Sequence, residues 1–378
     1  MTKIMTAGPV QVRENVRMAR SLVTTNPDVD PAFVEDYKAL CDKLEKIMNC
    51  SGTVYIMGGE GILGLEAACA SLTEPGDRVL VMDNGIFGRG FDGFVSMYGG
   101  EPVLYTKDYH KPFDADELRA YLEQDHDFKY ATLVHCDTPS GMLNPIDELC
   151  PVLAEYGIMS VVDSVSAMFG EPVDFDGSCI DILCGGSQKC LSAPPGLTMV
   201  WVSDKAMDAM CSRTTPVASF YANILTFKTY YEDKWFPYTM PISDIMGLAA
   251  AVDNYLAEPD VIGRHAHFGA ATRAAVTAAG LEMYVKEGYS NTVTVINVPE
   301  GITDRQILDT MLEDYGIMIT GAFDVLAGKV IRIGHMGENA NYEDMVETMK
   351  ALQGTLTKLG VNLQADMVEV FKRVAGIE

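Results

Sequence analysis

The feature that most constrains the fold of this 378-residue chain is an alternation of short apolar runs with longer amphipathic segments across its N-terminal half. Short runs rich in β-branched residues are typical of buried strands, and the longer segments are typical of helices. With strands that are apolar throughout, the alternation predicts a mostly parallel sheet covered by helices on both faces. The candidate strands are residues 53–57, 78–82, 102–106, 131–136, 160–162, 181–184 and 197–202, and the candidate helices between them are 62–72, 87–98, 114–124 and 146–156.

The pattern changes after about residue 241, where long helical stretches are followed by shorter apolar runs and further helices. This mixture predicts a smaller α+β domain. We therefore expect an α/β protein with a large domain on a seven-stranded sheet and a small C-terminal domain. The predicted boundaries are 1–20 for an N-terminal segment, 21–245 for the large domain and 246–378 for the small domain.

Charge and cysteine usage exclude several classes of function. The formal net charge of −25 at pH 7 argues against nucleic-acid and anionic-membrane partners. The nine cysteines form no Cys-x-x-Cys pair, which argues against a metal cluster or a disulfide framework. The first residues lack the apolar core of a signal peptide, and no apolar run approaches membrane-span length. We expect a soluble, cytoplasmic protein without a bound metal.

Two chemically active residues directly follow candidate strands. Lys189 lies in a glycine-rich loop after the apolar run 180–183, and Asp163 ends the run 159–162. Parallel sheets bind ligands at the carboxyl ends of their strands, so both side chains are expected at one edge of the sheet. A desolvated lysine can form a Schiff base with an aldehyde cofactor, and a carboxylate can keep the cofactor's pyridine nitrogen protonated. The pair therefore indicates pyridoxal 5′-phosphate (PLP), although either residue alone could be an ordinary loop residue.

A glycine-rich turn follows the first candidate strand and opens a helix at Gly61 and Ile62. Backbone N–H groups at a helix N-terminus bind anions, so the turn is a candidate site for a cofactor phosphate. The spacing of Gly59, Gly61 and Gly64 also fits a dinucleotide-binding turn, which leaves a nicotinamide-dependent dehydrogenase open as an alternative. That alternative gives the lysine motif no role.

Three further residues could act on a flat ring or a carboxylate. Phe87 follows a candidate strand and could stack on a pyridine ring, or it could be a core residue. Thr138 offers a hydroxyl where the chain leaves a strand, or it is a turn residue beside Pro139. Arg332 lies inside an apolar strand, where a charge is costly unless it is paired. Its guanidinium could hold a substrate carboxylate, or it could point to solvent from a half-exposed strand.

Together these residues resemble the class V aminotransferases of the fold-type I PLP enzymes, and especially the alanine–glyoxylate and serine–pyruvate aminotransferases. The resemblance covers nearly the whole chain, and the order and spacing of its motifs argue against a chance match. The matching stretches are 7–9, 61–68, 74–77, 84–88, 140–146, 162–165, 186–189, 193–196 and 328–334.

The resemblance implies a role for each matching position. Lys189 would bear the Schiff base, Asp163 would hold the pyridine nitrogen, Phe87 would stack on the ring and Thr138 would lie near its phenolic oxygen. The cofactor-binding positions that it implies are Gly61, Ile62, Phe87, Thr138, Asp163, Gln188, Lys189 and Thr239.

The resemblance also implies how substrate and subunits are arranged. Arg332 would bind the substrate carboxylate, and Gly8 lies where the N-terminal segment closes over the active site. Family members are homodimers with the active site at the subunit interface, and Thr239 matches a threonine that reaches the neighbouring subunit's phosphate.

One departure concerns the phosphate turn. The family usually has Ser-Gly followed by Thr, His or Ser, whereas this chain has Glu60-Gly61-Ile62. Polar side chains are lost, and a carboxylate lies near the expected phosphate. Either Glu60 points away or it binds something else, and phosphate binding would then depend on backbone amides, Gln188 and Thr239.

We therefore expect a PLP-dependent aminotransferase that moves an amino group from an amino acid of the alanine or serine type to a 2-oxo acid such as glyoxylate or pyruvate. The stretches 141–147 and 332–338 also resemble 2-aminoethylphosphonate–pyruvate aminotransferases, and ureidoglycine–glyoxylate aminotransferases are another close branch. A PLP-dependent lyase or cysteine desulfurase would need a cysteine in a mobile loop, and residues 321–328 contain none. A non-catalytic binding protein would leave costly charged residues without a use.

Overall fold

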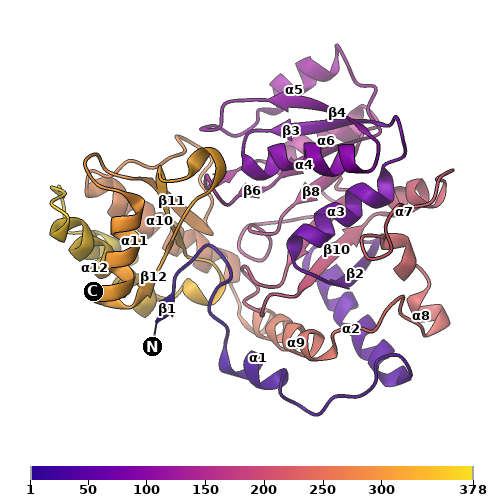
Figure 1. Cartoon of the computed structure of the whole chain (residues 1–378), viewed down its shortest axis with the longest axis horizontal. Coiled ribbons are helices and arrows are strands. Elements are labelled where there is room, and N and C mark those ends of the chain that lie inside the picture. The colour runs from indigo at the N-terminus through magenta and orange to yellow at the C-terminus, as the bar shows by residue number, and fades with distance from the viewer. Residues whose placement is uncertain (1, 377–378) are drawn as a thin grey trace.

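A seven-stranded sheet of order β2-β10-β9-β8-β5-β3-β4 lies at the centre of the computed structural model, which describes residues 2–376 (Figure 1). Its ladders are parallel except at β10, which runs antiparallel to both β2 and β9. The strands are β2 (Thr53–Gly58), β3 (Arg78–Asp83), β4 (Glu101–Thr106), β5 (Tyr130–Val134), β8 (Met159–Asp163), β9 (Ile182–Gly186) and β10 (Leu197–Val202). The predicted α/β fold on a mostly parallel sheet is confirmed.

Helices cover both faces of this sheet, as the strand β10 demonstrates. Side chains an odd number of residues apart in a strand point to opposite faces. On one face Gly64 of α3 lies so close to Thr198 that a Cβ would be 2.3 Å from the threonine Oγ1. On the other face the indole of Trp201 donates to the Leu44 carbonyl of α2. The large-domain helices are α2 (Pro31–Ile47), α3 (Gly61–Leu72), α4 (Ile86–Met97), α5 (Ala115–Leu122), α6 (Ile146–Glu155), α7 (Asp204–Cys211) and α8 (Tyr230–Asp233).

The predicted strand 131–136 is shorter in the structure, because β5 ends at Val134. The chain then turns through Pro139, so that β6 (Cys136–Asp137) pairs antiparallel with β7 (Met142–Leu143) in a small separate hairpin. This turn directs residues 137–138 toward the carboxyl edge of the large sheet.

The C-terminal part of the chain, orange to yellow in Figure 1, forms a second body with its own apolar core. Its antiparallel sheet has the order β11-β14-β13, and α11 begins with a capping box formed by Thr303 and Gln306. Its elements are α10 (Val261–Ala278), β11 (Val293–Asn297), α11 (Asp304–Tyr315), β12 (Ile317–Met318), β13 (Thr320–Gly321), β14 (Val330–Gly334), α12 (Tyr342–Lys358) and α13 (Met367–Val374), with 3-10 turns at Asp324–Leu326 and Gly337–Asn339. A further 3-10 turn, Ile224–Phe227, packs in the core of the large domain. The boundaries at residues 20 and 245 stay predictions.

The N-terminal segment connects the two bodies (Figure 1). β1 (Lys3–Ile4) pairs in parallel with β12 of the C-terminal body in a separate two-stranded sheet, and α1 (Glu14–Ala19) packs on α9 (Ile242–Ala257). Between them the Val10 amide donates to the Gln188 carbonyl at 3.2 Å. The segment therefore crosses the edge of the large sheet beside Lys189. None of the helices within residues 2–376 combines the length and the apolar character that a membrane crossing requires.

Candidate active site

A cavity of about 290 Å³ opens at the carboxyl edge of the large sheet, beneath β14 and the N-terminal segment. Most of its lining residues are far apart in the sequence but follow β2, β3, β6, β8 and β9. Eight of the ten predicted site residues line it, namely Gly8, Ile62, Phe87, Thr138, Asp163, Gln188, Lys189 and Arg332. The other two, Gly61 and Thr239, do not.

Lys189 reaches the cavity from the loop after β9, and its Nζ donates to the Ala7 carbonyl at 2.5 Å. Burial lowers the pKa of this lysine, and the nearby positive charge of Arg332 lowers it further. A lowered pKa increases the fraction of neutral amine near pH 7, which is the form that attacks a carbonyl carbon. No carboxylate within the described residues forms a salt bridge with Lys189, so its amine is held by an uncharged partner.

Asp163 ends β8 and is 5% exposed. Burial is the main reason that the pKa of its carboxyl is raised, to about 7. The negative charges of Asp137 and Glu60 also raise this pKa. The Val165 N–H, which donates to Oδ1 at 2.9 Å, and the positive charge of Lys189 lower it. A buried carboxylate with one hydrogen bond has capacity for a further donor. A protonated ring nitrogen is such a donor, and it would pair with the charge at the same time.

Thr138 takes part in a short chain of hydroxyl groups. Its Oγ1 donates to the Ser166 Oγ at 2.7 Å, and Ser166 donates to the Cys136 carbonyl at 2.8 Å. Ser166 also lines the cavity and was not predicted. Its position, three residues after Asp163 in the same loop, was the available signal.

Phe87 lies on one wall of the cavity, at the start of α4. Its backbone N–H donates to Oδ1 of the buried Asp137 at 2.9 Å, which fixes the loop that carries the ring. Phe323 reaches over from the small domain and meets Phe87 edge to face, with the ring centroids 5.9 Å apart. Phe323 was not predicted, because no pattern in its own segment of the sequence indicates that its side chain contacts the large domain.

Arg332 extends from β14 into the cavity and does not lie on a solvent-facing surface. Its Nε donates to the Gly321 carbonyl at 2.7 Å, and its Nη1 approaches the Thr138 carbonyl at 3.4 Å. Burial lowers the pKa of the guanidinium, and the charge of Asp137 opposes that shift. Among residues 2–376 it forms no salt bridge, so donors remain for a carboxylate ligand.

The turn that was expected to bind a phosphate is organised differently. Glu60 caps α3, where its Oε1 accepts from the Ile62 N–H at 3.1 Å, and the Gln188 Nε2 donates to Oε2 at 3.3 Å. Gly61 serves packing, since a Cβ there would lie 2.7 Å from Val165. Two of the donors predicted for a phosphate, the Ile62 N–H and the Gln188 amide, are thus engaged by the Glu60 carboxylate. The residues around the cavity fit a pyridine ring, but they do not fit a phosphate group at this turn.

Thr239 lies outside the cavity, where its hydroxyl donates to Asp28 Oδ2 at 2.9 Å. Its predicted contact was with a neighbouring subunit, so that role stays a prediction.

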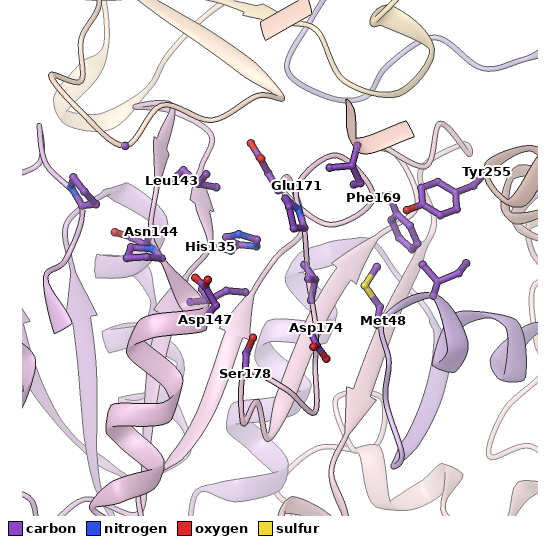
Figure 2. A pocket seen from close by; sticks show the side chains of 18 residues that line it. Met48, His135, Leu143, Asn144, Asp147, Phe169, Glu171, Asp174, Ser178 and Tyr255 are labelled. Carbon is purple, nitrogen blue, oxygen red and sulfur yellow. The ribbon is translucent and has the colours of Figure 1, made fainter. Parts of the chain in front are cut away.

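A second and larger cavity, of about 610 Å³, lies between α6 and the segment 169–178 (Figure 2). None of the predicted site residues lines it. Two of its buried polar side chains are engaged within the protein, because Glu171 accepts from the Asn291 amide and the His135 Nδ1 lies 3.0 Å from the Ser164 hydroxyl. The smaller cavity around Lys189 is therefore the candidate active site.

Comparison with known proteins agrees with this geometry. The family model described as aminotransferase class-V matches residues 37–336. A pyridoxamine–pyruvate transaminase of Mesorhizobium japonicum is 34% identical over 95% of this chain and 92% of its own length. An alanine–glyoxylate aminotransferase of Callithrix jacchus is 33% identical over 80% and 74%. The crystal structure of a ureidoglycine–glyoxylate aminotransferase from Bacillus subtilis superimposes with a TM-score of 0.95 at 27% identity, covering 100% of this chain and 98% of that one.

Proposed function

Because this chain belongs to the aminotransferase class-V family and is an aminotransferase, we propose that the cavity around Lys189 is its active site and that a 2-oxo acid accepts the amino group. The observation that carries the proposal is the convergence of a buried carboxylate, a lysine of lowered pKa and an unpaired guanidinium on one cavity. The alternative of a nicotinamide-dependent dehydrogenase is set aside, since it gives this triplet no role.

Each of these groups acts on a different part of the reactants. Asp163 would hold a protonated pyridine nitrogen, Phe87 would contact the face of the ring, and Thr138 would offer a hydroxyl to a ring substituent. When bound, the pyridine aldehyde of PLP, on which this family depends, supplies an electron-withdrawing ring that acidifies the carbon next to the transferred nitrogen. Lys189 supplies the amine that holds the aldehyde carbon. Once displaced, the same amine moves a proton between the two reacting carbons.

Arg332 determines which 2-oxo acids bind as acceptors of the amino group. A fork of guanidinium donors matches an α-carboxylate and places the adjacent oxo carbon toward Lys189. The named relatives act on pyruvate or glyoxylate, small 2-oxo acids that a cavity of about 290 Å³ can hold together with a pyridine ring. We propose pyruvate or glyoxylate as the acceptor for this chain.

A homodimer is the quaternary structure that we propose. Large apolar side chains are more than half exposed in two regions, the N-terminal residues 18–23 and the segment 220–235 that precedes Thr239; they are Met18, Leu22, Val23, Phe220, Tyr221 and Trp235. Contiguous exposed apolar surface is typical of an interface. Sedimentation at several concentrations tests the dimer.

The nine cysteines are all unpaired, which supports a reducing, cytoplasmic location.

The test of the catalytic proposal is an amino-acceptor assay with purified protein, pyruvate or glyoxylate, and a panel of amines. Lys189→Ala is expected to abolish turnover and the visible absorbance that the bound aldehyde gives. Lys350→Ala, which changes an exposed lysine of α12, is the matched control and should retain both. Turnover that survives in Lys189→Ala would remove this cavity from the reaction.

A further inference from the structure

We propose that this aminotransferase takes its pyridine partner without a 5′-phosphate, so that pyridoxamine is a diffusible amino donor and pyridoxal is a released product. The inference rests on the proposed function of the Lys189 site and deepens it by naming the donor. Its starting point is that a carboxylate of the chain itself lies where a phosphate would have to bind.

The N-terminus of α3 is the anion-binding element of the cavity, and Glu60 already engages it. The carboxylate accepts from the Ile62 N–H at 3.1 Å and from the Gln188 amide at 3.3 Å. A phosphate placed there would lose both donors and would meet a negative charge. Like charges in contact repel each other, and water around the exposed Glu60 screens part of that repulsion.

Within residues 2–376, no lysine, arginine or histidine forms a salt bridge with this carboxylate. The lining of the cavity contains two basic residues, Lys189 and Arg332. Lys189 donates to Ala7, and Arg332 donates to Gly321, so both lie on the side that handles the aldehyde carbon and the substrate carboxylate. Apart from these two residues and the hydroxyls of Thr138 and Ser166, which bond to each other and to the Cys136 carbonyl, the cavity lining has no arginine, lysine or hydroxyl side chain for a phosphate dianion.

The same corner suits a neutral hydroxymethyl group. The Gln188 side chain is 6% exposed, and its Oε1 is buried without a hydrogen-bond partner. Glu60 fixes which amide atom is free, because it takes the Nε2 donor. An O–H group can donate to Oε1, whereas a phosphate dianion offers only acceptors. Ile62 and Leu65 line the adjoining wall and provide apolar contact.

The proposed reaction is balanced without a further reagent. The C–N bond of pyridoxamine breaks, and a C–N bond forms at C2 of the oxo acid. A proton leaves the amine carbon, which is oxidised to an aldehyde, and a proton is delivered to C2, which is reduced to an amine. The carbonyl oxygen of the oxo acid is replaced by nitrogen, and one oxygen from water enters the aldehyde. Without a phosphate anchor, the ring is retained by Lys189, Asp163 and Phe87 and by the hydroxyl contacts of Thr138 and Gln188, so it can exchange.

The experiment is a competition for Lys189. The protein is incubated with equal concentrations of pyridoxal and pyridoxal 5′-phosphate, reduced with borohydride and digested, and the peptide carrying Lys189 is weighed by mass spectrometry. We expect the lighter, unphosphorylated product to exceed the phosphorylated one by at least about tenfold. In parallel, pyridoxamine and pyruvate should yield free pyridoxal and alanine in solution.

The variants Glu60→Gln and Glu60→Ser remove the charge, and serine retains the ability to cap α3. Both should shift the product ratio toward the phosphorylated form by about tenfold or more. Glu66→Gln makes the same charge change in the same helix, outside the cavity, and should leave the ratio unchanged. A predominantly phosphorylated Lys189 in the wild type, or a ratio insensitive to Glu60, would overturn the inference while leaving the proposed function intact. Failure of both compounds to label Lys189 would instead overturn the proposed function.

Discussion

Gly8 lies so close to Lys189 that an ideal Cβ on the glycine would fall 2.3 Å from the lysine Cδ and 2.7 Å from its Nζ. Gly8 also has a φ of +94°, in the left-handed region that favours glycine. The preceding residue, Ala7, accepts the hydrogen bond of the lysine amine. The N-terminal segment is thus built against the reactive side chain itself, and its path depends on the absence of a Cβ.

Gly8→Ala should therefore lower kcat/KM by about tenfold or more, because the methyl group displaces either the lysine or the N-terminal segment that covers it. Stopped assays of amino transfer, with thermal unfolding to verify the fold, measure this. The matched control is Gly90→Ala in α4, at an exposed helical glycine where an added Cβ would meet nothing within 4 Å. That control should retain activity and unfold at an equal or slightly higher temperature. Normal kinetics in Gly8→Ala would show that the contact has no catalytic consequence.

The sheet and most of the cavity could be predicted from the sequence for a physical reason. Buried parallel strands are apolar throughout, so each can be recognised in the sequence as a short apolar run. The residues that follow these strands meet at the carboxyl edge of the sheet. The contacts of Phe323 and Ser166 depend on how distant segments approach, and no local pattern encodes that. The hydrogen bonds of Glu60 could not be predicted for the same reason, because its contact with Gln188 joins segments that are far apart in the sequence.

Arg332→Ala should raise the KM for the 2-oxo acid by about tenfold to a hundredfold, because a bidentate charged hydrogen bond to the carboxylate is lost. Labelling of Lys189 by the pyridine aldehyde should persist, since Arg332 contacts neither the ring nor Asp163. Steady-state kinetics and borohydride reduction measure the two effects separately. Arg305→Ala, on the exposed surface of α11, is the control. An unchanged KM would exclude Arg332 from substrate binding.

Asp163→Asn should change how the stability of the ligand-free protein depends on pH. Burial raises the pKa of this carboxyl to about 7, whereas the unfolded chain titrates near 4. The stability that it contributes is fully present below about pH 4 and is lost as pH rises toward about 7, at up to about 1.4 kcal/mol per pH unit. The asparagine variant should therefore gain stability relative to the wild type across that window.

Urea unfolding of both proteins at several pH values measures the difference between their free energies of unfolding. The contributions of the other titrating groups are common to both proteins and cancel in this difference. Asp208→Asn, at an exposed position of α7, provides the control and should give a constant offset. Parallel curves for Asp163→Asn and the wild type would mean that the buried carboxyl does not titrate in this range.

The contact between Phe87 and Phe323 predicts coupling between the two domains. Phe87→Leu should weaken binding of pyridoxal by up to about tenfold, because leucine has no aromatic face to stack on the ring. Phe323 is 46% exposed, so Phe323→Leu should cost little stability, yet it removes the edge-to-face contact that orients Phe87. We expect it to weaken binding by roughly twofold to fivefold. The double variant should bind pyridoxal about as weakly as Phe87→Leu alone, since Phe323 acts through Phe87. Dissociation constants for the four proteins complete the cycle, and strictly additive losses would show that Phe323 contacts the ring independently.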